Sequence, residues 1–195
     1  MINLPSIITR VNWVDIFAVI LAIRIVYIAF RNGLKVEFFK LLGTLTALYV
    51  SLHYYTSLSA FLNQRIFSRQ DPSSTLNAFS FLLLFCAGYG VFFLLRVLIG
   101  RVVKSEVHAN LDKWGGLAVG ACRALLTVSL FLCFFISTDK PYFRKSIFGS
   151  FLGPDAVTFA PDTYACFWNT VASKLQRNEK MNPAVSEMRG ASEKK

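Results

Sequence analysis

An arginine in the middle of a long apolar run is the first feature of this sequence that needs a chemical explanation. Arg123 is the sole charged residue between Trp114 and Ile136. At about 1.5 Å per residue a helix over this run is roughly 34 Å long, enough to cross a hydrocarbon core of about 30 Å. An unpaired arginine near the centre of such a helix costs on the order of 3 kcal/mol. We therefore expect Arg123 to have a partner inside the protein.

The spacing of small residues indicates which way Arg123 points. On a helix, Gly116, Gly120, Arg123 and Thr127 lie within about 60° of one another. Small residues allow two helices to approach closely, so this face is the one that packs against other helices. The sequence thus predicts that Arg123 faces the interior of a helix bundle.

Glu37 is the favoured partner of Arg123, with Thr44 or Thr46 as additional acceptors. Glu37 lies near the start of the second apolar run, on the same side of the predicted membrane as the start of the run that holds Arg123. Asp112 lies on that same side, whereas Asp15 is expected near the opposite interface, about 14 Å or more away in depth. The expected pair is therefore Glu37–Arg123.

Two further charged residues, Asp15 and Arg24, lie in the first apolar run. Asp15 shares a face with alanines near the start of the predicted helix, where it either caps the helix N-terminus or pairs within the bundle. Arg24 points to the opposite side, roughly 9 Å from the end of the run at Phe30. Its side chain is expected to extend to the lipid headgroups.

Glycines mark a turn and a second packing face. Gly33 is the turn residue of the short basic connection 31–40. Gly43, Ala47 and Ser51 recur every four residues in the second run, a spacing of small residues that favours close helix packing. Gly33 and Gly43 are thus candidate structural residues rather than ligand-binding ones.

Residue patterns typical of enzymes are missing. The two histidines, His53 and His108, form no H-E-x-x-H motif, and the chain has no phosphate-binding glycine loop and no paired carboxylates within an apolar run. The four cysteines form no C-x-x-C pair, which disfavours a zinc site and a disulfide framework. We predict a non-enzymatic protein with no catalytic, cofactor-binding or metal-binding residues.

Composition places the chain in a membrane. It is 54% hydrophobic and 16% charged, whereas about 25% of the residues of a soluble domain are charged. The net charge of +10 suits either nucleic acid or an anionic membrane surface. The long apolar runs decide for the membrane. The expected partners are anionic lipid headgroups, further copies of the chain or other membrane proteins, and not nucleic acid.

The apolar runs predict an all-α membrane protein with four transmembrane helices in a bundle, a short interfacial loop helix and a C-terminal amphipathic helix. The spans are expected at 13–30, 36–55, 78–95 and 114–136, within a transmembrane domain at 13–136. The interfacial helix is expected in the loop 56–77, from the helical spacing of its apolar residues. The other parts are a lead-in at 1–12, a loop and amphipathic helix at 137–175 with Asp162 as N-cap, and a disordered basic tail at 176–195.

The distribution of basic residues predicts the orientation. The loops 31–40 and 96–113 carry seven Lys and Arg residues, whereas residues 1–12 and 56–77 carry three. Because positive residues in short loops stay in the cytoplasm, these two basic loops are expected to be cytoplasmic. Lys140, Arg144 and Lys145, just after the fourth span, argue in the opposite direction.

The order of several short motifs resembles the colicin V production protein (CvpA) family of bacterial inner-membrane proteins over about 13–154. The motif at 116–123 resembles the family's Gly-x-x-Arg-Gly pattern, although Ala124 stands where a second glycine is usual. The other matching parts are Asp15, the turn Arg31, Gly33, Glu37, Leu41 and Leu42, HYYTSLSAFL at 53–62, LDKWGGLAVGACRALLTV at 111–128 and KSIFGSFLGP at 145–154.

This resemblance implies a multi-pass inner-membrane protein linked to colicin V production or export. Two hypotheses follow for its action. The first is an accessory or structural role in toxin production, export or envelope homeostasis, in which the Arg123 pair fixes helix register. The alternative is an oligomeric small-solute channel or transporter with Arg123 lining the path, which four spans without a helix break make less favourable.

Overall fold

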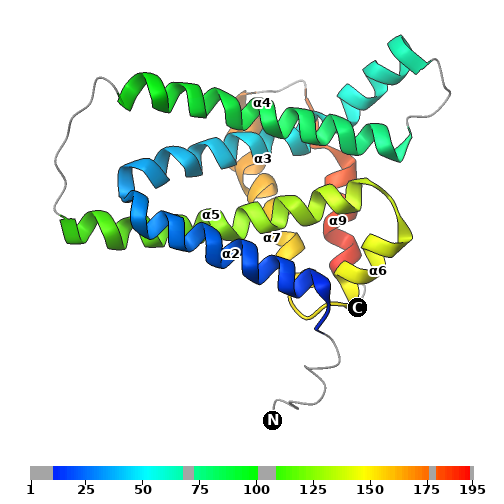
Figure 1. Ribbon diagram of the computed structural model, residues 1–195. Helices are drawn as coiled ribbons and strands as arrows, with labels where there is room; N and C mark the ends of the chain where they lie inside the picture. Colours follow the sequence, from blue (N-terminus) through cyan, green and yellow to red (C-terminus); the bar gives the residue numbers. More distant parts are fainter. Residues whose placement is uncertain (1–10, 68–72, 101–108, 176–178, 194–195) are drawn as a thin grey trace.

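Four long helices form the body of the protein (Figure 1). The computed structural model describes residues 11–67, 73–100, 109–175 and 179–193, which form helices and no strands. α3 packs against α4 and α5, and α2 packs mainly against α5. The predicted all-α fold is confirmed, with α2 (Trp13–Asn32), α3 (Leu34–Leu62), α4 (Ser74–Gly100) and α5 (Ala109–Ser137) containing the four predicted spans.

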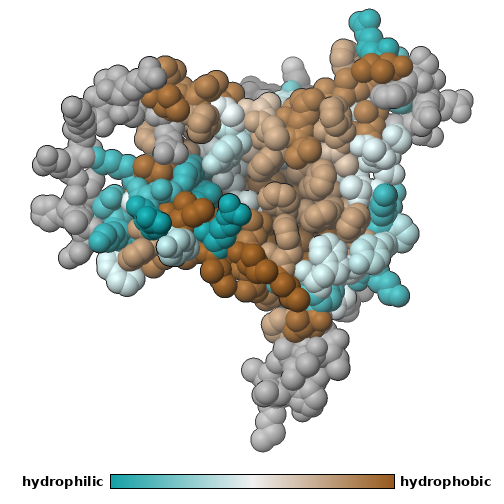
Figure 2. Space-filling view, viewed as in Figure 1, coloured by the Kyte–Doolittle hydropathy of each residue, from teal (hydrophilic) through white to brown (hydrophobic). Residues whose placement is uncertain are grey.

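Three helical segments are long and apolar enough to cross a membrane: Trp13–Asn32, Ser74–Leu95 and Asp112–Ser137. Apolar side chains cover the middle of the molecule, and hydrophilic ones gather at the left-hand end, near the α2–α3 turn (Figure 2). The chain is thus an all-α membrane protein. α3 is 29 residues long, but its Thr, Ser, His and Tyr residues lower its hydropathy, so the count of four spans stays a prediction.

Small residues bring α3 and α4 together. A Cβ atom added to Gly88 of α4 would lie 2.8 Å from Cα of Ala47, and one added to Gly43 of α3 would lie 3.1 Å from Cβ of Phe92. The predicted packing face of α3 is therefore in contact with α4. A Cβ atom on Gly90 would meet nothing within 4 Å, so the close contact on α4 is made by Gly88.

The interfacial helix predicted within 56–77 is not a separate element. α3 continues without a break to Leu62 and ends in the π-helical turn η1 (Asn63–Phe67). The apolar spacing that suggested a new helix is the last part of α3, with Ser59 and Asn63 buried. Parts of four predicted segments lie outside the described residues: 1–10 of the lead-in, 68–72 of this loop, 101–108 of the basic loop, and 176–178 and 194–195 of the tail.

The region 137–175 is more helical than predicted. The expected irregular stretch contains α6 (Pro141–Gly149) and the start of α7 (Gly153–Phe167), which continues through the π-helical turn η2 (Trp168–Ala172) into α8 (Ser173–Leu175). Asp162 lies inside α7 and is not its N-cap. The prolines in this stretch suggested irregular structure. However, Pro141 and Pro154 lie in the first turns of α6 and α7, where proline is well tolerated.

A serine from α5 makes Pro161 tolerable inside α7. Proline has no N–H, so the carbonyl of Val157 lacks its usual helical donor. The Ser129 hydroxyl donates to this carbonyl at 3.1 Å and accepts the N–H of Ala160 at 2.7 Å. α7 therefore docks on α5 beside the proline, through the carbonyl of Val157 and the N–H of Ala160.

The tail 176–195 was predicted to be disordered, and this is wrong for its described part, which contains α9 (Pro183–Glu193). Val185 is fully buried, and the side-chain amide of Asn182 donates to the carbonyl of Leu52 at 2.7 Å. The tail has too few apolar residues for a core of its own. It is ordered because it adds those few to a core that already exists, mainly against α7.

A buried hydrogen-bond chain joins the tail to α3. Burial raises the pKa of Tyr164, which keeps its hydroxyl protonated. This hydroxyl lies 2.7 Å from Nδ1 of His53, whose Nε2 lies 2.9 Å from the Glu179 carboxylate. The His53 ring thus lies between two partners, with Nδ1 toward Tyr164 of α7 and Nε2 toward Glu179 of the tail. His53 is therefore a buried residue that connects α3 to α7 and the tail.

Candidate functional site

The predicted ion pair between Arg123 and Glu37 is present and lies inside the bundle. Nε and Nη2 of Arg123 donate to the same carboxylate oxygen, Oε2 of Glu37, at 2.9 and 2.7 Å. Glu37 is completely buried, and Arg123 is 8% exposed. α5 supplies the arginine from the face of Gly116 and Gly120, and the first turn of α3 supplies the glutamate. Two helices that are distant in sequence are thereby joined by a charge-assisted contact.

The second oxygen of Glu37 is also occupied. Oε1 accepts hydrogen bonds from Nζ of Lys40 at 2.6 Å and from Nδ2 of Asn32 at 2.8 Å. We call Asn32, Glu37, Lys40 and Arg123 the Glu37 cluster. Its two cations and one anion leave a formal charge of +1. Because both oxygens of Glu37 already accept two hydrogen bonds each, the cluster is built to hold α2, α3 and α5 in place, and its carboxylate has little capacity left to accept a proton from a substrate.

Gly116 and Gly120 allow α5 to reach the α2–α3 turn. A Cβ atom on Gly120 would overlap the Cβ atom of Ala29, and it would lie 3.9 Å from Oε2 of Glu37. A Cβ atom on Gly116 would lie 2.9 Å from the carbonyl carbon of Gly33. The predicted packing face of α5 therefore meets α2 and the turn, and this close approach brings Arg123 within reach of Glu37.

The turn itself depends on Gly33 and Asp112. Gly33 has a φ of 79°, a conformation that favours glycine, and a Cβ atom there would collide with the Asp112 carboxylate. This carboxylate accepts the backbone N–H of Leu34 at 2.8 Å, so the first turn of α3 is capped by a residue from α5. Asp112 thus fixes the place where α3 begins, and Glu37 is one turn further on.

Asp15 lies at the opposite end of the bundle and combines the two predicted roles. Its carboxylate accepts the N–H of Asn12, whose side chain caps the start of α2 in a capping box. It also accepts the N–H groups of Phe151 and Leu152 at 3.2 and 2.7 Å, which ties the α6–α7 connection to α2. Asp15 is therefore a structural acceptor that is remote from the Glu37 cluster.

The remaining candidate residues lie outside the Glu37 cluster. Gly43 packs against α4 and does not join the Glu37 cluster. Arg24 is exposed on α2, as its spacing predicted. Thr44 donates to the Lys40 carbonyl, and Thr46 lines a groove on another face of α3, so the partner of Arg123 is Glu37 and not these threonines.

Sequence reasoning missed Asn32, Asp112 and Ala29 as parts of this site. Each acts through a contact between helices, so its own sequence neighbours give no signal. The one available sign was the Asp-Lys pair before the double glycine at 112–116, which places an acid at the start of α5. Within the described residues no group of three or more His, Cys, Asp or Glu side chains could hold a metal ion.

These features define a class, a multi-pass helical membrane protein whose helices are joined by a buried acid–arginine pair beneath a glycine-containing turn. The model of the family described as Colicin V production protein matches residues 14–158. The chain therefore belongs to the Colicin V production protein family. Comparisons with curated proteins and with solved structures give no match.

Reversing the charge of Arg123 tests the pair directly. In Arg123→Glu two carboxylates face each other, and we expect a large loss of folded, monodisperse protein in detergent, since breaking a buried pair costs about 3–5 kcal/mol. Adding Glu37→Arg restores opposite charges and should recover part of the yield; recovery is incomplete because Lys40 remains beside the new arginine. Arg24→Ala, on the exposed face of α2, is the control for the loss of a positive charge within a span. No rescue, with both single variants inserted normally, contradicts the pairing.

Filling the close contact at Gly120 is a second test. Gly120→Ala should destabilise the protein by about 1–3 kcal/mol, because the new methyl group overlaps that of Ala29. Ala29→Gly in the same chain makes room and should restore the thermal unfolding temperature. Gly90→Ala adds the same methyl group where no atom lies within 4 Å and should leave that temperature unchanged or raise it. Equal effects at Gly120 and Gly90 would rule out the close contact.

Proposed function

We propose that this protein is a non-enzymatic, accessory or structural component of the bacterial inner membrane in colicin V production or export, or in envelope homeostasis. Membership of the Colicin V production protein family supports the process. Arg123 is 8% exposed and donates twice to the fully buried carboxylate of Glu37, which supports a structural role for this arginine in the middle of α5. Anionic lipids and other inner-membrane proteins, or further copies of the chain, are the proposed partners.

Arg123→Ala separates this role from that of a channel. We expect less folded protein in the membrane, and secreted colicin V that falls in proportion to it, because the variant loses the contact that holds α3 against α5. Membrane protein level by immunoblot and secreted toxin by inhibition of a sensitive strain are the measurements, with Arg24→Ala as control. A normal protein level together with altered solute flux in reconstituted vesicles would favour the alternative of an oligomeric channel with Arg123 lining the path.

We further propose that the basic loops 31–40 and 96–113 face the cytoplasm. The support is the excess of Lys and Arg in these two short connections. The tail lies at the other end of the bundle, where the side-chain amide of Asn182 donates to the backbone carbonyl of Leu52. In this orientation the tail would be extracytoplasmic. The basic residues of 176–195 weigh less, since they lie beyond the roughly 15–20 residues next to a span that set the orientation.

Labelling of single cysteines tests the orientation. In a background without the four native cysteines, a membrane-impermeant maleimide should label Lys180→Cys in spheroplasts and Arg31→Cys after disruption alone. Both positions are exposed, so access to the reagent depends on the side of the membrane. The reverse labelling pattern would place both basic loops outside.

A further inference from the structure

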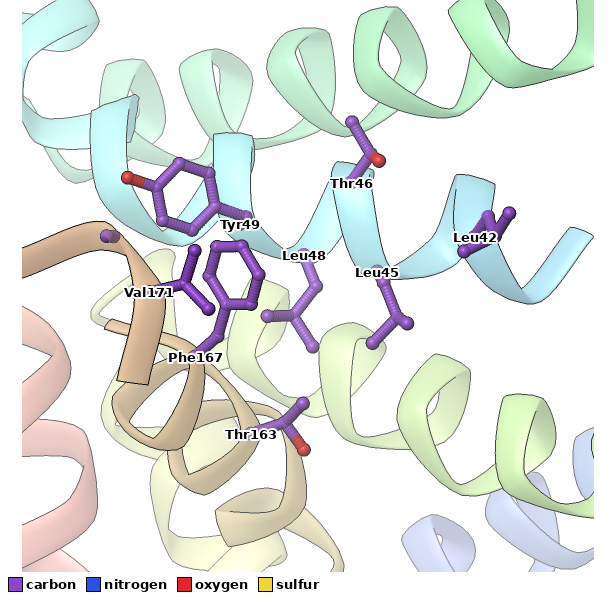
Figure 3. A pocket seen from close by; sticks show the side chains of 9 residues that line it. Leu42, Leu45, Thr46, Leu48, Tyr49, Thr163, Phe167 and Val171 are labelled. Carbon is purple, nitrogen blue, oxygen red and sulfur yellow. The ribbon is translucent and has the colours of Figure 1, made fainter. Parts of the chain in front are cut away.

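An apolar groove lies between α3 and the α7–η2 segment, away from the Glu37 cluster. Its volume is about 460 Å³, within the range of roughly 300–1,000 Å³ of small-molecule sites. Leu42, Leu45 and Tyr49 form the α3 wall, and Phe167 and Val171 form the opposite wall, with Phe167 pointing at Tyr49 (Figure 3). The ring centroids of Tyr49 and Phe167 are 5.2 Å apart and close one end.

The groove offers a ligand little to hydrogen-bond. Leucine, phenylalanine, valine and alanine side chains form most of its lining. The hydroxyl of Thr163, which also lines it, already donates to the carbonyl of Phe159 at 2.7 Å. A ligand that fills this groove therefore has to be apolar along its length, since a polar one would lose its hydrogen bonds to water without replacement.

The depth of the groove in the membrane identifies the surrounding medium. Leu42, Leu45 and Tyr49 lie around the centre of the predicted span 36–55. The faces of α3 that carry Ala47 and Glu37 are covered by α4 and α5, whereas the groove is open on its outer side. At this depth the opening meets lipid acyl chains, which match the lining in polarity.

Basic residues lie where the headgroup of such a lipid would be. Lys35 is seven residues before Leu42, on nearly the same face of α3, and roughly 15 Å from the span centre, at the edge of a hydrocarbon core about 30 Å thick. Arg31, at the end of α2, is exposed at the same end of the bundle. Within the described part of the chain neither residue forms an ion pair, in contrast to Lys40. The positive charge favours an anionic headgroup.

The helix opposite α3 is distorted at the groove. Val171 and Ala172 line the groove and belong to η2, a π-helical turn between α7 and α8. Single π-helical turns inside α-helices are frequent at functional sites, since the wider turn carries a backbone cost that packing has to offset. The distortion lies at the groove wall, next to Trp168, which is buried and stacks on His53 at 5.0 Å.

We propose that this groove binds one acyl chain of an anionic phospholipid, whose headgroup lies at Lys35 and Arg31. The chain would lie along Leu42, Leu45 and Tyr49 beneath Phe167 and Val171. This site is separate from the Glu37 cluster, and it depends on the membrane location of the protein and not on a role in colicin V production.

Trp168 allows the site to be measured. The sequence has three tryptophans, so Trp13→Phe with Trp114→Phe leaves Trp168 as the only one. Reconstitution with phosphatidylglycerol brominated in its acyl chains should quench Trp168 fluorescence at low mole fraction and saturate. Brominated phosphatidylcholine should need a higher mole fraction. Leu45→Phe and Val171→Phe fill the groove and should reduce the saturable quenching, while thermal unfolding shows that both variants fold.

A substitution of Lys35 tests the proposed contact with the lipid headgroup. Lys35→Gln should lower the preference for phosphatidylglycerol over phosphatidylcholine about fivefold, the effect of one basic residue near an anionic surface. Lys145→Gln, the same change on exposed α6 at the other end, should leave the preference unchanged. Quenching that rises linearly with bromolipid and ignores the groove-filling variants overturns the site. Saturable quenching without preference for phosphatidylglycerol overturns the anionic assignment.

Discussion

The structure depends on the cost of placing an arginine inside a membrane bundle. Arg123 can be there because Glu37 supplies a carboxylate that is itself held by Lys40 and Asn32. A buried pair of this kind adds little net stability compared with apolar residues of the same size, but any arrangement that separates the two charges is strongly penalised. Its effect is therefore on register: it fixes how far α5 is shifted along α3, and with that the packing of α2 against α5.

The glycines and the capping carboxylates serve the same constraint. Gly116 and Gly120 bring the α5 backbone to Ala29 and Gly33, and without this approach the guanidinium could not reach Oε2 of Glu37. Asp112 caps α3 from α5, and Asp15 holds the α6–α7 connection from α2. Each carboxylate satisfies backbone N–H groups that lipid could not satisfy. The acids of the bundle are thus part of its frame, which agrees with a structural role.

The second half of the chain extends this frame to one side of the bundle. Ser129 pairs with the backbone of α7 next to Pro161, and the tail is tied to α3 through Asn182 and His53. The groove exists because α7 and η2 approach α3 at Tyr49 and diverge from it toward Leu42. The proposed lipid site lies on this outer surface, apart from the contacts of the Glu37 cluster.

The sequence by itself determined the helical membrane class, the inward face of Arg123 and its pairing with Glu37. Hydrophobic run length, helical periodicity and the cost of an unpaired charge act locally or over a whole span, so they can be read from residue order. Only the tertiary structure decided that α3 continues to Leu62, that α7 passes through Pro161 and that α9 is ordered. In each case a contact from a distant helix satisfies backbone groups or buries side chains that the local sequence leaves without a partner.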